Sequence, residues 1–261
     1  MRRAIRVEWL KLTRSRVTLV ATSLLGLLLP AMGLSFYSVA LSGGNGVLAD
    51  KARAFLVDEG WAGYLGLVDQ IAAVAVFLGA GIVVAWAFGR EHTDRTFPSL
   101  FALPVSRGKI AAAKFAVLIA WTVVLSVVVS LVTVVLGLVG GVGPLTADVV
   151  GPEVVRLQGI STTAGLLALT MGLVASLGRG YLPAIGVLAV IIAITQVAVL
   201  FGTGGWFPFA VPGLMAVAGV DGIPEPNALQ VLLVPTVAAL GVWLTIRWWQ
   251  HAEVVSRFSR S

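Results

Sequence analysis

Long runs without any charged residue alternate with short charged segments along this chain, and this pattern constrains its fold more than any other feature. Residues 70–89 and 115–147 carry no charge, whereas residues 89–114 between them carry seven charged side chains. A charge at the centre of a membrane-spanning helix costs about 2.5–3.5 kcal/mol. Residues 89–114 are therefore expected to form a loop in water between two membrane spans.

The composition supports a membrane protein. Of the 261 residues, 58% are hydrophobic and only 11% are charged, and the mean hydropathy is +0.99, whereas a soluble domain has about 25% charged residues. The apolar runs are too uniform for barrel strands, which alternate between apolar and polar positions. Because backbone amides in lipid must be satisfied within their own segment, we predict an all-α integral membrane protein.

Six apolar segments have the length that a span requires, about 20 residues. They form a single transmembrane domain over residues 1–261, and Pro30 is expected to kink the first of them. The first segment is too long for the apolar region of a cleaved signal peptide. The predicted spans are residues 17–41, 62–88, 110–138, 159–177, 183–201 and 228–248.

The positive charges predict the orientation. Fifteen of the eighteen Lys and Arg residues fall on the side that holds both termini, and the other side has only Lys51, Arg53 and Arg156. Since positive residues favour the cytoplasmic side, both termini are expected in the cytoplasm. The net charge of +6 thus reflects orientation and affinity for the inner leaflet, and a nucleic-acid partner is not expected.

Two further elements are expected at the membrane surfaces. Residues 3–16 predict an interfacial helix, because Ile5, Trp9 and Leu12 follow i, i+4, i+7 spacing among six basic residues; the alternative is an ordinary basic flank of the first span. Residues 202–227 contain four prolines and several glycines in an apolar segment. They predict a broken helical hairpin on the outer side.

No enzymatic site is expected. The two histidines, His92 and His251, fall in cytoplasmic segments, and no H-E-x-x-H pattern or other set with metal-ligand spacing occurs. The chain also lacks the G-x-x-x-x-G-K-[ST] pattern of a nucleotide-binding loop. If ATP drives this protein, a separate ATPase subunit must bind it, together with Mg²⁺.

Few polar side chains lie in the predicted spans, and these are candidates for a substrate pathway. Asp69 is the one carboxylate with a position inside a span, which makes it a functional candidate by default. An exposed carboxylate at the outer interface is an equally good interpretation. Gln70 and Gln196 complete this candidate set.

The loop at residues 89–109 and the start of the third span contain Glu91, Thr96, Phe97, Leu100, Phe101, residues 103–107 and Lys114. In these residues the loop resembles the first cytoplasmic loop of ABC-2 type transporter permeases. The turn at residues 178–183 and the Trp206-Phe207-Pro208 segment resemble the short bacitracin- and lantibiotic-resistance permeases of that family. Arg95, where the family has Gly, and Pro98 depart from its loop pattern.

This resemblance implies the membrane subunit of an ATP-driven exporter, which pairs with a second permease copy or paralogue and with two ABC ATPase subunits. The loop would carry a helix that docks on the ATPase, and the second and fifth spans would lie near the dimer seam. The implied substrate is amphipathic: a peptide antibiotic, a drug or a lipid-like molecule. The implied ATPase-coupling residues are Glu91, Asp94, Arg95, Thr96, Phe97, Leu100 and Phe101, and the implied outer gate is Trp206, Phe207, Pro208 and Pro212.

The residues of the loop support docking independently. Phe97, Leu100 and Phe101 follow i, i+3, i+4 spacing and give a helix one apolar face. That face would otherwise fold back onto the ends of the spans. Two other function classes stay open: an ion-coupled secondary carrier that uses Asp69, and a non-transporting scaffold or immunity protein.

Overall fold

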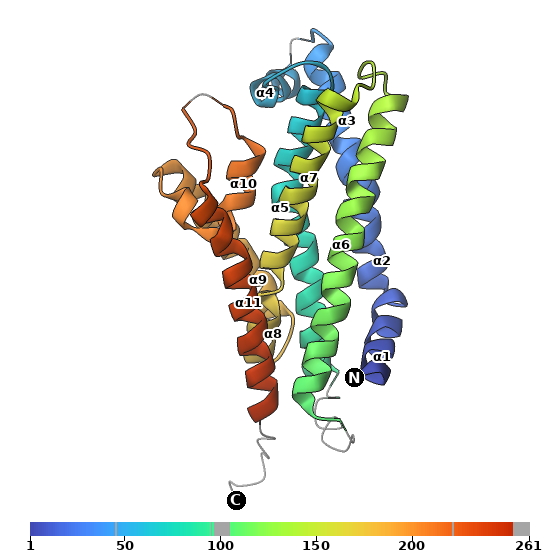
Figure 1. Ribbon diagram of the computed structural model, residues 1–261, viewed down its shortest axis with the longest axis vertical. Helices are drawn as coiled ribbons and strands as arrows, with labels where there is room; N and C mark the ends of the chain where they lie inside the picture. Colours follow the sequence, from blue (N-terminus) through green and yellow to red (C-terminus); the bar gives the residue numbers. More distant parts are fainter. Residues whose placement is uncertain (45, 95, 97–104, 221, 253–261) are drawn as a thin grey trace, which may run out of the picture.

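The computed structural model describes the chain except for residues 45, 95, 97–104, 221 and 253–261, and every regular element in the described part is a helix (Figure 1). Six helical segments are long and apolar enough to cross a membrane. The prediction of an all-α chain with six spans is therefore confirmed. The segments are Arg16–Leu41, Gly60–Thr93, Arg107–Val139, Ala147–Leu177, Leu182–Leu200 and Ala228–His251.

A short amino-terminal helix precedes the first span. This helix, α1 (Arg2–Thr13), is separated from α2 (Arg16–Ser23) by Ser15, whose hydroxyl accepts hydrogen bonds from the amides of Val17 and Thr18. A serine in this position satisfies amides that have no partner within the first turn of a helix. The chain therefore restarts its helix at Arg16 in a new direction.

The first span changes its winding just before the proline. After α2 the chain forms a π-helical turn, η1 (Leu24–Leu28), and continues as α3 (Leu29–Leu41), in which Pro30 occupies the first turn. Proline has no amide hydrogen and its ring collides with the carbonyl four residues earlier, that of Gly26. The wider π turn leaves room for the proline ring. The distortion expected at Pro30 is therefore present as a π turn in the residues just before it.

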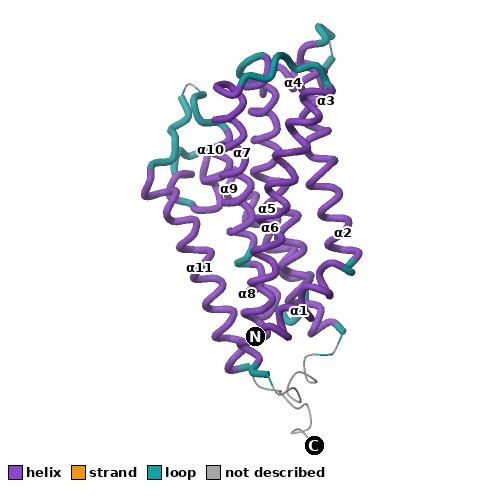
Figure 2. The backbone as a smooth tube through the Cα atoms, turned by 45° about the vertical axis from the view of Figure 1, so that its right-hand side comes forward, coloured by secondary structure: helices purple, strands orange, loops and turns teal. Residues whose placement is uncertain are grey.

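Helix α5 (Gly60–Thr93) forms the centre of the bundle. It contacts α3, α7 (Ala147–Ala168), α8 (Met171–Leu177) and α9 (Leu182–Leu200). Of the most apolar stretch of α5, 61% is buried, compared with 11% for α9. The long α5 therefore runs through the middle of the bundle (Figure 2), whereas the low burial of α9 places it at the periphery.

The fourth span begins earlier than the sequence suggested. Helix α7 starts at Ala147, whereas the predicted fourth span begins at residue 159. The polar residues that suggested a loop are used within the helix: Glu153 and Arg156 form an ion pair at i, i+3 spacing. Leu157 is fully buried between them and the core. A short break at residues 169–170 then separates α7 from α8.

The remaining helices lie toward the end of the bundle opposite the two termini and at the periphery (Figure 1). Helix α4 (Val47–Phe55) follows the first span. The proline-rich segment folds into two 3₁₀ turns, η3 (Gly204–Trp206) and η4 (Pro208–Ala210), and α10 (Val211–Ala216). Helix α11 (Ala228–His251) follows.

Both ends of the described chain lie at the same end of the bundle. The start of α1, the carboxyl end of α11 and the start of α6 (Arg107–Val139) lie at the lower end in Figure 1, opposite α4. This arrangement is the one expected from six spans. It also places the junction between α5 and α6 close to α1.

Candidate functional site

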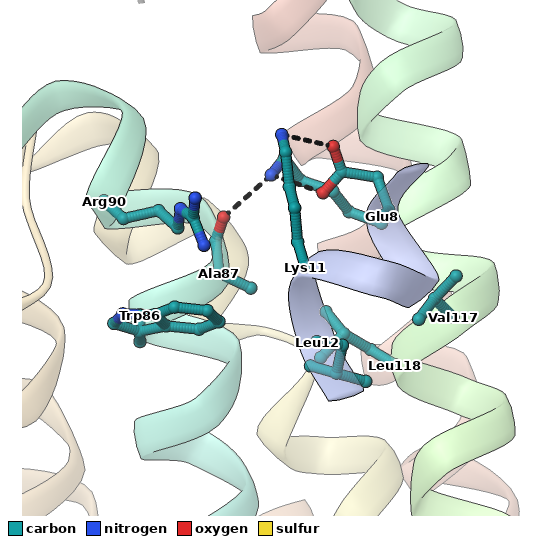
Figure 3. Close-up of a pocket in the computed structure, with 9 residues that line it drawn as sticks. Glu8, Lys11, Leu12, Trp86, Ala87, Arg90, Val117 and Leu118 are labelled. Atoms are coloured by element: carbon teal, nitrogen blue, oxygen red, sulfur yellow. Dashed lines mark hydrogen bonds and ion pairs between the residues drawn. The ribbon is translucent and has the colours of Figure 1, made fainter. Parts of the chain in front are cut away.

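Four charged side chains meet where α1, α5 and α6 converge. Glu8 and Lys11 come from α1, Glu91 from the last turns of α5, and Lys114 from the first turns of α6. Figure 3 shows Glu8 and Lys11 facing Ala87, one turn before Glu91. We call these four residues the ion cluster.

Lys114 is the centre of the ion cluster. Its Nζ donates to Glu8 Oε2 at 2.9 Å, to Glu91 Oε1 at 3.0 Å and to the carbonyl oxygen of Ala87 at 3.0 Å. All three hydrogens of the ammonium group therefore have an acceptor, as a buried lysine requires. One side chain thereby joins three helices.

Lys11 closes the cluster on its exposed side. Its Nζ lies 2.7 Å from Glu8 Oε1 and 3.2 Å from Glu91 Oε1. Burial acts to lower the pKa of Lys11, but the Glu8 and Glu91 carboxylates outweigh it, so the pKa of Lys11 is raised above its usual value. With two carboxylates and two ammonium groups the ion cluster has no net charge.

Three of the four members of the ion cluster are buried, and Lys11 is partly exposed. Lys114 is 2% exposed, Glu91 4% and Glu8 8%. The remaining space beside these residues is about 10 Å³, at the lower limit of what one water molecule needs. Removing one member of such a buried pair costs about 3–5 kcal/mol, because the partner charge is left uncompensated. The cluster is therefore stable only when its members stay together.

The ion cluster lies directly at the start of the loop that connects α5 and α6. The second carboxylate oxygen of Glu91 accepts a hydrogen bond of 2.9 Å from the hydroxyl of Thr96. At the other end of the loop, Arg107 donates to the carbonyl oxygens of Gln250, at 3.2 Å, and of Ala252. One end of the loop is thus tied to α1 and the other to the end of α11.

The structure places only some of the predicted coupling residues. It brings Glu91 and Thr96 together, and Asp94 lies exposed at the end of α5. The other predicted coupling residues are outside the described part of the chain: Arg95, Phe97, Leu100 and Phe101.

Sequence reasoning missed the role of Glu8. The inward face of α1 consists of Ile5, Glu8 and Leu12, of which the last two are buried, whereas Trp9 is 44% exposed. The expected face of Ile5, Trp9 and Leu12 therefore includes one residue that points away from the bundle. A signal was present, since Glu8 is the one acidic residue among six basic ones in residues 1–16.

The candidate pathway residue Asp69 belongs to a second ion pair, in which the aspartate is buried and the side chain of Arg156 is 29% exposed. Asp69 is fully buried, and its Oδ2 accepts a hydrogen bond of 2.7 Å from Arg156 Nε. Arg156 also lies 2.5 Å from Glu153. The exposed interfacial position that was one interpretation of Asp69 is therefore wrong. Of the other pathway candidates, Gln70 bonds to the carbonyl oxygen of Phe55 at 3.1 Å.

The other outer-side candidates lie apart from the ion cluster. Gln196 is exposed on α9, Trp206 is 62% exposed and Pro212 is buried. Phe207 stacks against Phe209, with ring centroids 5.5 Å apart. Pro208 begins η4. Within the described residues, no group of three acidic or histidine side chains is arranged to hold a metal ion.

The fold and the ion cluster define a membrane protein with several spans and a group of paired charges at the start of the loop between α5 and α6. A family model described as ABC-2 family transporter protein matches residues 4–196, so the chain belongs to that family, as the membrane subunit of an ABC transporter. It is also similar to the bacitracin transport permease protein BCRB of Bacillus licheniformis, with 23% identity over 177 residues, which is 67% of this chain and 83% of that protein.

Proposed function

We propose that this permease subunit exports an amphipathic compound and that residues 89–109 couple it to separate ABC ATPase subunits. The ion cluster is the observation that carries this proposal. It connects the first residues of the loop, through Glu91, to the interfacial helix α1 and to the start of α6. A partner that pushed the loop would therefore displace three helices together.

The anchoring of both ends of the loop supports this coupling role. Thr96 is bonded to the ion cluster, and Arg107 is bonded to the end of α11. A loop tied at both ends to different helices transmits displacement with little loss, because packed interfaces are close-packed and not continuously deformable. ATP and Mg²⁺ would bind to the partner ATPase.

A second permease copy or paralogue would complete the transport unit. Only 11% of the apolar stretch of α9 is buried within one chain, and 22% of that of α11. The side chains of Ile194, Val197 and Leu200 are 47%, 52% and 82% exposed along α9. These apolar faces are available for a partner permease or for lipid.

The proposed substrate class and location rest on different observations. The relative BCRB is named for bacitracin transport; for this chain we propose a peptide antibiotic, a drug or a lipid-like molecule. The proposed location is the plasma membrane of a bacterium, which rests on the similarity to a Bacillus licheniformis protein. The asymmetry of the Lys and Arg residues supports an orientation with both termini in the cytoplasm.

The decisive experiment tests whether the loop holds the ATPase. We expect that Ala at Phe97, Leu100 and Phe101 together lowers the affinity for the ATPase by about tenfold or more, because large apolar anchors dominate interfaces. Phe55→Ala, an exposed phenylalanine of the outer helix α4, is the matched control and should leave the affinity unchanged. Unchanged ATPase binding in the triple variant would contradict the proposal.

A second variant separates docking from coupling. Glu91→Gln keeps the shape of the side chain but removes its charge from the ion cluster. We expect the ATPase to bind normally while transport per ATP hydrolysed decreases. Transport that persists without any ATPase and is lost in Asp69→Asn would identify an ion-coupled carrier instead. Partner binding without any flux would identify a scaffold.

A further inference from the structure

A groove at membrane depth separates the first span from α5. Its volume is about 610 Å³, within the range of small-molecule sites. All lining residues except one are apolar. Its walls are one face of the first span from Arg16 to Met32 and one face of α5 from Ile71 to Ile82.

The π turn of the first span shapes this groove. Leu25 is buried and lies so close to Gly79 that a β-carbon on this glycine would come within 2.7 Å of it. Leu24 and Leu28, the first and last residues of the same π turn, are each 48% exposed. Leu25 therefore contacts Gly79 within the groove, while Leu24 and Leu28 leave apolar surface open to an occupant.

Positive charge is present only at the cytoplasmic end of the groove. Arg16, the first residue of the first span, lies there. On α5 the groove-lining face continues from Ile82 to Trp86 and Arg90 at i, i+4 spacing, and the Arg90 guanidinium lies 4.7 Å from the Trp86 ring centroid (Figure 3). Neither arginine forms an ion pair with a described residue.

The groove is shorter than a bilayer is thick. On α5 it runs from Ile71 to Ile82, about 16 Å, and on the first span from Arg16 to Met32, about 24 Å at 1.5 Å per residue. The hydrocarbon core of a bilayer is about 30 Å thick. A spanning helix of a second copy would continue past Ile71 and Met32 to the other surface, whereas an acyl chain anchored at Arg16 would end within the groove.

We propose that this groove binds one anionic phospholipid of the cytoplasmic leaflet. One of its two acyl chains lies along Leu24 and Leu28, and its phosphate is held at Arg16, with Trp86 and Arg90 at headgroup level. Basic side chains beside a cytoplasmic membrane surface attract anionic lipids, and tryptophan favours the interface. The groove thereby places a lipid against the first span and α5 at the same time.

Lipid retention tests the headgroup contact. The full chain is reconstituted in nanodiscs that contain equal phosphatidylglycerol and phosphatidylcholine, extracted into mild detergent, and its retained lipid is measured by mass spectrometry. We expect phosphatidylglycerol to be enriched, and Arg16→Gln to lower this enrichment about fivefold. Arg14→Gln, an exposed arginine that does not line the groove, should change it less than twofold. Equal retention of both lipids by the wild type would overturn the proposal.

Filling the groove tests the acyl-chain contact. Ala75→Leu should lower retention of both lipids severalfold, whereas Ala120→Leu, the same change on an exposed face of α6, should not. Unchanged retention in Ala75→Leu, or a lower dimer fraction with normal lipid, would overturn the proposal; the second result would assign the groove to another copy.

Photocrosslinking of the unmodified chain keeps the proposal testable if a variant does not fold. Phosphatidylglycerol with a diazirine in its acyl chain should label peptides within residues 16–32 and 71–82 preferentially. Labelling spread evenly over all six spans would show that the groove has no bound lipid.

Discussion

The ion cluster makes a strong prediction for Lys114→Met. Methionine retains an unbranched apolar stem but has no ammonium group. The substitution therefore keeps most of the contact with the rings of Phe88 and Trp249, whose centroids lie 6.0 Å from Nζ. It removes the three hydrogen bonds and leaves Glu8 and Glu91 with one remaining cation, that of Lys11.

The magnitude follows from burial. Breaking a buried ion pair by removing one partner costs about 3–5 kcal/mol, and Lys11 still offsets one of the two carboxylates. We therefore expect a loss of about 3 kcal/mol in the free energy of unfolding. For a chain of this size this corresponds to a decrease of about 6–12 °C in the melting temperature.

The measurement is thermal unfolding of the purified chain in detergent, followed by the fluorescence of its eight tryptophans. Lys109→Met is the matched control, because Lys109 is an exposed lysine on the same helix; it should change the melting temperature by less than 2 °C or so. Adding Glu8→Gln to Lys114→Met restores neutrality and should recover about 1–3 kcal/mol. Equal melting temperatures for Lys114→Met and Lys109→Met would refute the reasoning.

Two further predictions use matched pairs in the same thermal assay. Gly165→Ala should lower the free energy of unfolding by about 1–3 kcal/mol, because the new β-carbon would lie 2.1 Å from Thr122 Cγ2. Gly151→Ala on the same helix meets open space and should stabilise the fold by about 0.5–1 kcal/mol. Similar effects of the two changes would contradict the α6–α7 packing. Asp69→Asn should lower the free energy of unfolding by about 1–3 kcal/mol, because it weakens the ion pair of a buried carboxylate. Asp50→Asn, at an exposed ion pair, should lower it by less than about 0.5 kcal/mol. An unchanged free energy of unfolding in Asp69→Asn would show that its ion pair does not stabilise the fold.

Hydropathy was sufficient to predict the six spans because length and apolar composition are properties of each segment alone. The confirmed fold class needed no knowledge of which helices touch. Boundaries were harder at residues 147–158, where polar residues suggested a loop. Glu153 and Arg156 form an ion pair within a helix. In a short stretch of sequence, the composition of such a helix differs little from that of a loop.

The ion cluster could not be predicted from local pattern, because its members are distant in the chain. Glu8 and Lys114 are 106 positions apart, and each alone resembles an ordinary charge at the end of a span. The same holds for Asp69, whose partner Arg156 is 87 positions away and was counted only as an outer-side cation. Buried ion pairs are determined by tertiary packing, so a single sequence suggests the residues but not their partners.

The two groups of charges in this molecule have different consequences for movement. Surface arginines orient the chain and can separate at little cost, whereas the ion cluster cannot open without leaving a buried charge unpaired. Helix α1, the end of α5 and the start of α6 must therefore move as one body under any force applied to the intervening loop. Since α1 leads directly into Arg16 and the first span, such a movement would also alter the groove beside α5. A lipid bound in that groove would then favour one position of this body over another, because a ligand shifts an equilibrium only by its differential affinity for the two states.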